Sequence, residues 1–150
     1  MPSPDPTLCR EQLATLMAGL NVQLAALEGL LTREYDLLQN RDAEGLEKSG
    51  AARQQCIGHI VRMEDERGAL CRATGREEDA AGLHSLLAWC DPTGLLAPVM
   101  QEYRERTQRC REQNDRNGLL VNGRLQQDAR TYGPGNEEVG GYGRKLTTRA

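Results

Sequence analysis

The chain has 150 residues, which is enough for one domain and too few for two full cores. Hydrophobic residues make up 38% and aromatic residues 3%, with no Phe, so Leu and Ala must supply most of the buried surface. These two residues favour helices over strands. The formal net charge of -3 indicates neither a basic nucleic-acid surface nor a strongly acidic tail.

The beginning of the sequence, MPSPDPT, lacks the basic region, apolar segment and small-residue cleavage site of a secretory signal. No apolar run reaches the roughly 20 residues that a membrane-spanning helix needs. We therefore expect a cytoplasmic chain with no membrane insertion. The five cysteines are widely spaced and form no C-x-x-C pair, which in a cytosolic chain is typical of buried thiols rather than disulfides.

The first predicted element is a long helix over residues 6–39. Asp5 supplies an N-cap and Pro6 fits the first helical position, where its missing N–H is not needed. The stripe that follows has steps of three and four residues, which is typical of coiled coils. It consists of Leu13, Met17, Leu20, Leu24, Leu27, Leu31 and Leu38. Glu34 is the one break in this stripe.

A short connection over residues 40–42 predicts an antiparallel hairpin with a second helix. The apolar side of that helix consists of Leu46, Ile57, Ile60, Val61, Met63 and Leu70. Interior glycines weaken it by about 1 kcal/mol each, so it should depend on packing against the first helix. Glu34 with Arg53 and Arg67 either forms a polar layer between the two helices or lies in solvent.

A third, short helix is predicted over residues 77–90, because Thr74 and Glu77 match a capping box. Its buried residues would be Ala80, Leu83, Leu86, Leu87 and either Trp89 or Cys90. A last helix over 97–130 has a polar middle, and the glycine-rich segment 131–150 should be a flexible tail. The sequence thus predicts an all-α fold: an extended antiparallel hairpin or coiled-coil-like bundle in one domain, 1–130.

Groups that could carry chemistry are few. His59 and His84 are the only histidines, and their pairing with Cys56 and Cys90 has no structural-zinc spacing. No nucleophile elbow, zincin or phosphate-loop motif occurs. We therefore expect no metal, no cofactor and no enzymatic activity.

The end of the last helix is the most informative segment. A polar stretch runs directly into Leu119, Leu120 and Val121, with Leu125 one turn beyond and the glycine-rich segment after it. Contiguous apolar residues in this position suit a binding face for an amphipathic partner helix. Ordinary packing against the first helix is the alternative, and composition alone does not separate the two.

The order of motifs along the chain resembles the FlgN-like flagellar export chaperones. The first helix carries L-x-x-E-Y-x-x-L, the second ends in an Arg followed by a Leu, and the last contains N-x-x-N-G-x-L-[LV] before T-Y-G-x-G. The matching residues are Leu31, Glu34, Tyr35, Leu38, Arg67, Leu70, Asn114, Asn117, Gly118, Leu120, Val121, Thr131, Tyr132, Gly133 and Gly135. The resemblance covers nearly the whole chain.

The resemblance implies a cytosolic chaperone that binds the C-terminal helical end of hook-filament junction proteins and delivers them to the export gate or its ATPase complex. The partner-binding residues it implies are Asn114, Asn117, Gly118, Leu120, Val121 and Leu125. Tyr132 is the residue we match to gate docking, with Tyr142 as the competing position. The alternative is a structural or regulatory coiled-coil protein that acts through homodimerisation.

Overall fold

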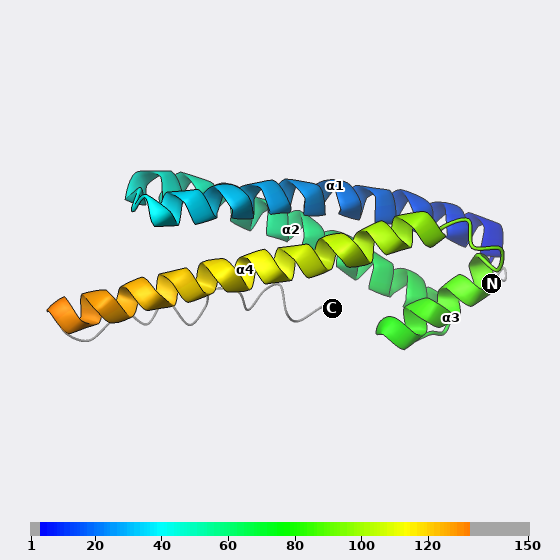
Figure 1. Cartoon of the computed structure of the whole chain (residues 1–150). Helices are drawn as coiled ribbons and strands as arrows, with labels where there is room; N and C mark the ends of the chain where they lie inside the picture. Colours follow the sequence, from blue (N-terminus) through cyan, green and yellow to red (C-terminus); the bar gives the residue numbers. More distant parts are fainter. Residues whose placement is uncertain (1–3, 133–150) are drawn as a thin grey trace. The chain divides into compact units, whose positions relative to one another are not determined.

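Four α-helices make up nearly all of residues 4–132, the part of the chain that the computed structural model describes, and this part contains no strand (Figure 1). They are α1 (Pro6–Gln39), α2 (Ala43–Ala73), α3 (Ala80–Cys90) and α4 (Ala97–Tyr132). The predicted all-α fold is therefore confirmed. The flexible tail predicted from residue 131 stays a prediction, because α4 ends at Tyr132 and residues 133–150 lie outside the described range.

The helices contribute to two compact units. Unit 1 comprises the described residues of Met1–Ala25 and Gly58–Arg106, and unit 2 those of Ala26–Ile57 and Thr107–Ala150. Each unit thus contains part of α1, α2 and α4, and unit 1 also contains α3. The expectation of one domain over residues 1–130 stays a prediction.

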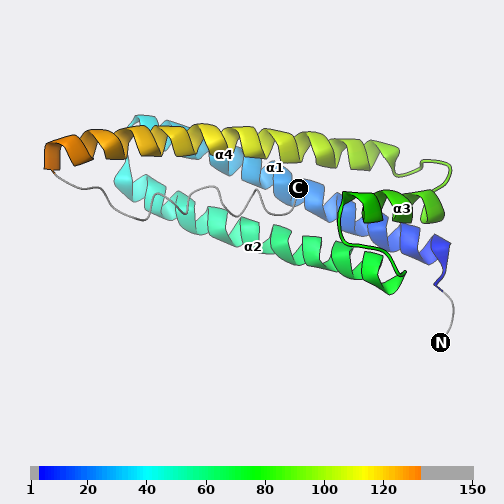
Figure 2. The ribbon, with the colours of Figure 1, turned by 90° about the horizontal axis from the view of Figure 1, so that it is seen from below.

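The turn between α1 and α2 lies in unit 2 and forms as expected, so that the two helices run in opposite directions (Figures 1 and 2). Arg41 takes a left-handed conformation with φ of 55°. Asp42 then accepts a hydrogen bond of 2.9 Å from the Gly45 backbone N–H, which caps α2. A Cβ on Gly45 would lie 2.6 Å from the Asp42 carboxylate, so this cap favours glycine at that position.

The start of α3 differs from the sequence-based prediction. The helix begins at Ala80 rather than at residue 77, and its N-cap is Asp79, whose carboxylate accepts a 2.8 Å hydrogen bond from the Gly82 N–H. The Thr74 hydroxyl instead donates to the Cys71 carbonyl at the end of α2. A Cβ on Gly82 would lie 1.7 Å from the Glu77 carbonyl oxygen, so the chain before α3 approaches too closely for any other residue.

The core of unit 1 is apolar with a few paired polar groups. Its buried apolar residues are Cys9, Leu13, Met17, Leu20, Leu24, Ile60, Cys71, Leu83, Leu86, Cys90, Leu96, Met100 and Tyr103. Of the residues expected to be buried in α3, Ala80 is exposed, Leu87 and Trp89 are half-buried, and Cys90 is buried.

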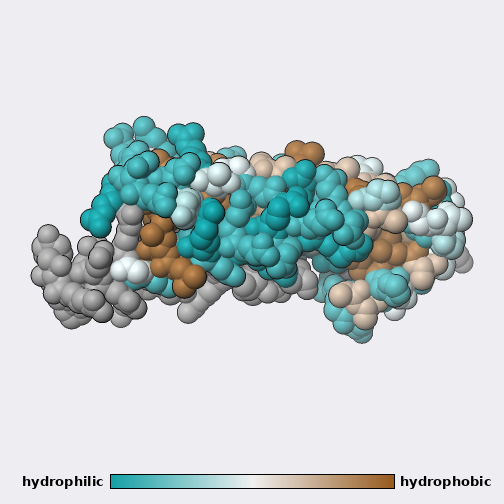
Figure 3. Space-filling model, viewed as in Figure 1, coloured by the Kyte–Doolittle hydropathy of each residue, from teal (hydrophilic) through white to brown (hydrophobic). Residues whose placement is uncertain are grey.

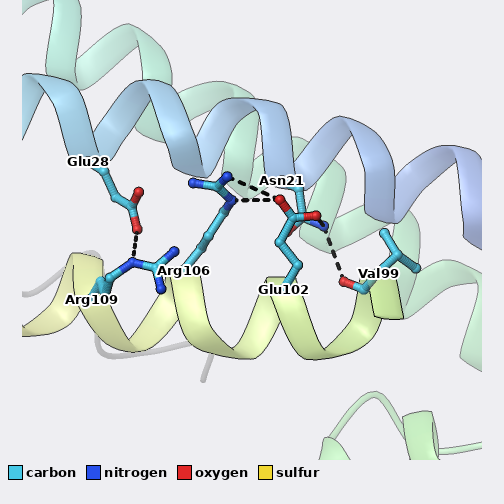
Figure 4. A network of polar contacts seen from close by, with 6 residues as sticks. All are labelled: Asn21, Glu28, Val99, Glu102, Arg106 and Arg109. Carbon is cyan, nitrogen blue, oxygen red and sulfur yellow. Dashed lines mark hydrogen bonds and ion pairs between the residues drawn. The ribbon is translucent and has the colours of Figure 1, made fainter. Parts of the chain in front are cut away.

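Polar side chains inside unit 1 have partners. The Asn21 amide donates to the Val99 carbonyl at 3.1 Å and to the Glu102 carboxylate at 3.2 Å (Figure 4). Glu64 accepts hydrogen bonds from Arg67, at 2.8 Å, and from the Tyr103 hydroxyl. Arg67 therefore belongs to a polar cluster of unit 1, so the prediction that it joins Glu34 in one layer is wrong.

α1 corrects a second expectation, namely that no segment is long and apolar enough to span a membrane. Among the described residues, α1 passes that test by length and composition. The core helix of a soluble protein passes the same test, so it is weak evidence of a span. Most of the apolar stripe of α1 is buried within the two units, from Leu13 to Leu24 in unit 1 and at Leu27, Leu31 and Leu38 in unit 2.

We predict that Leu20→Ala lowers the free energy of unfolding by about 2–5 kcal/mol, because the fully buried side chain leaves a cavity. Leu8→Ala is the matched control on the same helix, where the side chain is 52% exposed. It should change stability by less than about 0.5 kcal/mol. Urea unfolding followed by far-ultraviolet circular dichroism measures both, and equal losses would contradict the assigned core.

Candidate partner-binding site

The later part of α4, in unit 2, has an unusual buried side. Cys110, Asn114 and Asn117 follow steps of four and three residues and are all at most 2% exposed. This spacing puts them on one side of the helix, at positions where a bundle helix usually carries leucine. A polar side therefore packs where an apolar one is expected.

Asn117 ties this side of α4 to α1. Its side-chain amide donates a 2.9 Å hydrogen bond to the backbone carbonyl of Leu31. The Oδ1 atoms of Asn114 and Asn117 are buried and have no hydrogen-bond partner among the described residues. A buried polar atom left without a partner costs about 1–3 kcal/mol, so the two asparagines weaken the packing of α4 in this unit.

Further contacts between α4 and α1 in unit 2 are polar and lie near the surface. The Arg109 guanidinium forms a 2.7 Å ion pair with Glu28 (Figure 4). Gln113 donates to the Thr32 hydroxyl at 3.1 Å.

A stacking contact completes this set, because the Arg116 guanidinium lies 3.8 Å from the centre of the Tyr35 ring. Exposed ion pairs contribute about 0–1 kcal/mol, and an exposed cation–π contact contributes about 0.5–1 kcal/mol. The contacts around the asparagines are therefore weak individually.

The contact between α1 and α2 in unit 2 contains a buried ion pair. Glu34 lies 3.2 Å from Arg53, and their side chains are 4% and 15% exposed. The predicted polar layer thus forms between these two residues, and the alternative that they lie in solvent is wrong for this pair. Burial raises the pKa of Glu34 above its ordinary value, and the nearby Arg53 charge opposes that rise.

α4 carries three consecutive apolar side chains at residues 119–121, just beyond Asn117. Leu119 is 72% exposed, and Leu120 and Val121 are half-buried. We call these three residues the α4 apolar patch. Figure 3 shows hydrophobic surface over this later part of α4. Large exposed apolar side chains that adjoin one another mark interaction sites more often than isolated ones.

The predicted partner-binding residues occupy different environments. Asn114 and Asn117 are buried, Gly118, Leu120 and Val121 are half-buried, and Leu125 and Tyr132 belong to α4 with side chains outside the described part. The structure therefore gathers Leu120 and Val121 with Leu119, while it turns the two asparagines inward. The burial of the two asparagines could have been predicted from their spacing. With Cys110 they continue, at steps of three and four residues, the buried side of α4 that begins with Met100 and Tyr103.

The potential metal ligands lie apart. Among residues 4–123, whose side chains the structure describes, no group of three or more His, Cys, Asp or Glu side chains is placed to hold a metal ion. His59 contacts Arg62 at 2.6 Å, and burial raises the pKa of the Cys56 thiol, which disfavours the reactive thiolate. The features of unit 2 suit binding of a protein segment.

Comparison with known proteins agrees with this architecture. The family model described as FlgN protein matches residues 9–133. The chain therefore belongs to the FlgN family, and it is a flagellar export chaperone that binds flagellar proteins. No match was found among the curated proteins or the solved structures.

The Glu34 carboxylate should make stability depend on pH. Its folded-state pKa is raised, so the protonated form is favoured by folding, and the carboxylate destabilises the protein above that pKa. We expect wild type to gain stability relative to Glu34→Gln as the pH falls through the folded-state pKa toward the ordinary value of 4.5. Urea unfolding at a series of pH values measures this. A loss of wild-type stability on acidification, relative to Glu34→Gln, would contradict the assignment.

Proposed function

We propose that the chain is a cytoplasmic chaperone that binds the C-terminal helical region of hook-filament junction proteins. It would prevent their premature association and deliver them to the export gate. The observation that carries this proposal is the α4 apolar patch, since Leu119 is 72% exposed and its neighbours Leu120 and Val121 are only half-buried. Membership of the FlgN family supports the general class of client.

The chemistry of the patch suits an amphipathic helix. Such a helix has one apolar stripe, and before assembly that stripe would be exposed to solvent and prone to aggregation. Burial of apolar surface contributes about 25 cal/mol per Å², so covering the stripe with the α4 apolar patch supplies affinity without a cofactor. Leu125, one turn beyond Val121 in the sequence of α4, would extend the same contact.

Delivery requires a second contact that leaves the client in place. Tyr132 is the last residue of α4 and lies eleven positions beyond Val121, so one partner need not cover both. A tyrosine supplies a large, rigid contact area and a hydroxyl at modest entropic cost. We assign it to docking at the export gate or its ATPase complex.

We predict that Leu119→Glu abolishes client binding and leaves the melting temperature unchanged, because the leucine is exposed and loses no internal contact. Isothermal titration with a synthetic peptide of a junction protein's C-terminal helix measures the affinity. Leu8→Glu is the control, since it places the same charge on an exposed leucine of unit 1. Equal affinities of both variants and wild type would refute the patch as the client site.

We further predict that Tyr132→Ala leaves client affinity and melting temperature intact and reduces secretion of the junction proteins. Tyr142→Ala is the paired variant, because Tyr142 competes for the same role and lies outside the described residues. Secretion is measured in cells that carry each variant in place of the wild-type gene. Normal secretion with Tyr132→Ala would contradict the docking role, and a secretion loss with Tyr142→Ala alone would move that role to Tyr142.

A further inference from the structure

In unit 2, the buried sides of α1 and α4 differ in polarity. On α1, Leu27 and Leu31 are fully buried, and both adjoin residues that α4 contacts, namely Glu28 and the Leu31 carbonyl itself. On α4, the buried side offers Asn114 and Asn117, each with an oxygen that finds no partner in the described part of the chain. Unit 2 thus combines a buried apolar stripe on α1 with a buried side of α4 that carries two unpaired asparagine oxygens.

The inward residues of α4 differ between the two units. In unit 1, the inward residues of the same helix are Met100 and Tyr103, and the Tyr103 hydroxyl has a buried acceptor in Glu64. In unit 2, a buried hydrogen bond joins the Asn117 amide of α4 to the Leu31 carbonyl of α1. A segment whose buried side carries unpaired polar atoms and whose other contacts are polar and near the surface is of the kind that opens locally at low free energy.

Resting on the function proposed above, we propose that α4 from Thr107 to Gly123 is a displaceable cover, and that the client's amphipathic helix takes its place against α1. A leucine-bearing stripe matches Leu27 and Leu31 better than asparagine does, and displacement returns the two unpaired asparagine oxygens to water. The exposed α4 apolar patch contacts the client in the closed state and stays in contact with it after displacement, so Leu119 contributes to the final affinity.

This arrangement gives the chaperone a way to release its client. The packing of the polar cover against α1 is weak. The cover can therefore compete with the bound client helix for α1 without preventing the client from binding. If the buried side of α4 were fully apolar, its packing against α1 would be too stable for the client helix to displace it. The asparagines thus set the balance between the free and the client-bound states.

Two variants shift the balance in opposite directions. Replacing both residues, Asn114→Leu with Asn117→Leu, should tighten the cover, slow amide hydrogen exchange across residues 107–123 and weaken affinity for the client-helix peptide on the order of tenfold. Asn117→Ala removes the hydrogen bond to the Leu31 carbonyl, so exchange should quicken and affinity should stay equal or rise. Gln108→Leu, an exposed apolar change on α4, is the control and should alter neither quantity.

The outcomes separate this inference from the proposed function. If the wild-type chain fails to bind the peptide, the proposed client is wrong, while the exchange rates still test the cover. If residues 107–123 exchange as slowly as residues 97–106 of the same helix, the cover is not displaceable. If the double leucine variant binds the peptide as tightly as wild type with its cover slowed, the client does not occupy the face of α1, and that result overturns the inference.

Discussion

The apolar stripe of α1 is the constraint on which both units depend. In unit 1 it buries Leu13, Met17 and Leu20 completely, and in unit 2 it does the same with Leu27 and Leu31. α1 is present in both units, so its stripe fixes which sides of α2 and α4 can be apolar in each. Helices of this length gain most of their stability from such packing rather than from intrinsic propensity.

The two units use the stripe differently. Unit 1 closes it with further apolar side chains from α3 and α4, and its buried Glu64 is paired with Arg67 and Tyr103. Unit 2 carries the buried Glu34–Arg53 pair and the two asparagines of α4. Buried polar groups contribute little to stability and can favour specificity, which suits a unit whose function is to contact a partner.

The periodic elements could be predicted from the sequence because their signals are local. The stripe of α1 and the Asp5–Pro6 start give the bounds of that helix, and residues 40–42 give the turn. The start of α3 could not be predicted in the same way. Asp79 caps the helix in place of the predicted Thr74–Glu77 box, and Gly82 permits the close approach of the Glu77 carbonyl oxygen to its first turn.

The candidate site was predicted in part for a related reason. Adjacent leucines after a polar stretch indicate an exposed patch, and Leu119 is indeed exposed. The burial of Asn114 and Asn117 is harder to predict, because the Asn117 amide is satisfied by a backbone carbonyl 86 residues away in sequence. A polar residue in a helix is usually assigned to the surface unless its register with the buried stripe is followed through.

Hydrogen exchange of the wild-type chain with and without a junction protein's C-terminal helix tests the central claim most directly. We expect binding to protect α1 over residues 26–39, where the client covers the stripe of unit 2. Exchange in α4 should increase over residues 107–123, where the cover has been displaced. Protection confined to unit 1, at residues 6–25 or 58–106, would contradict it.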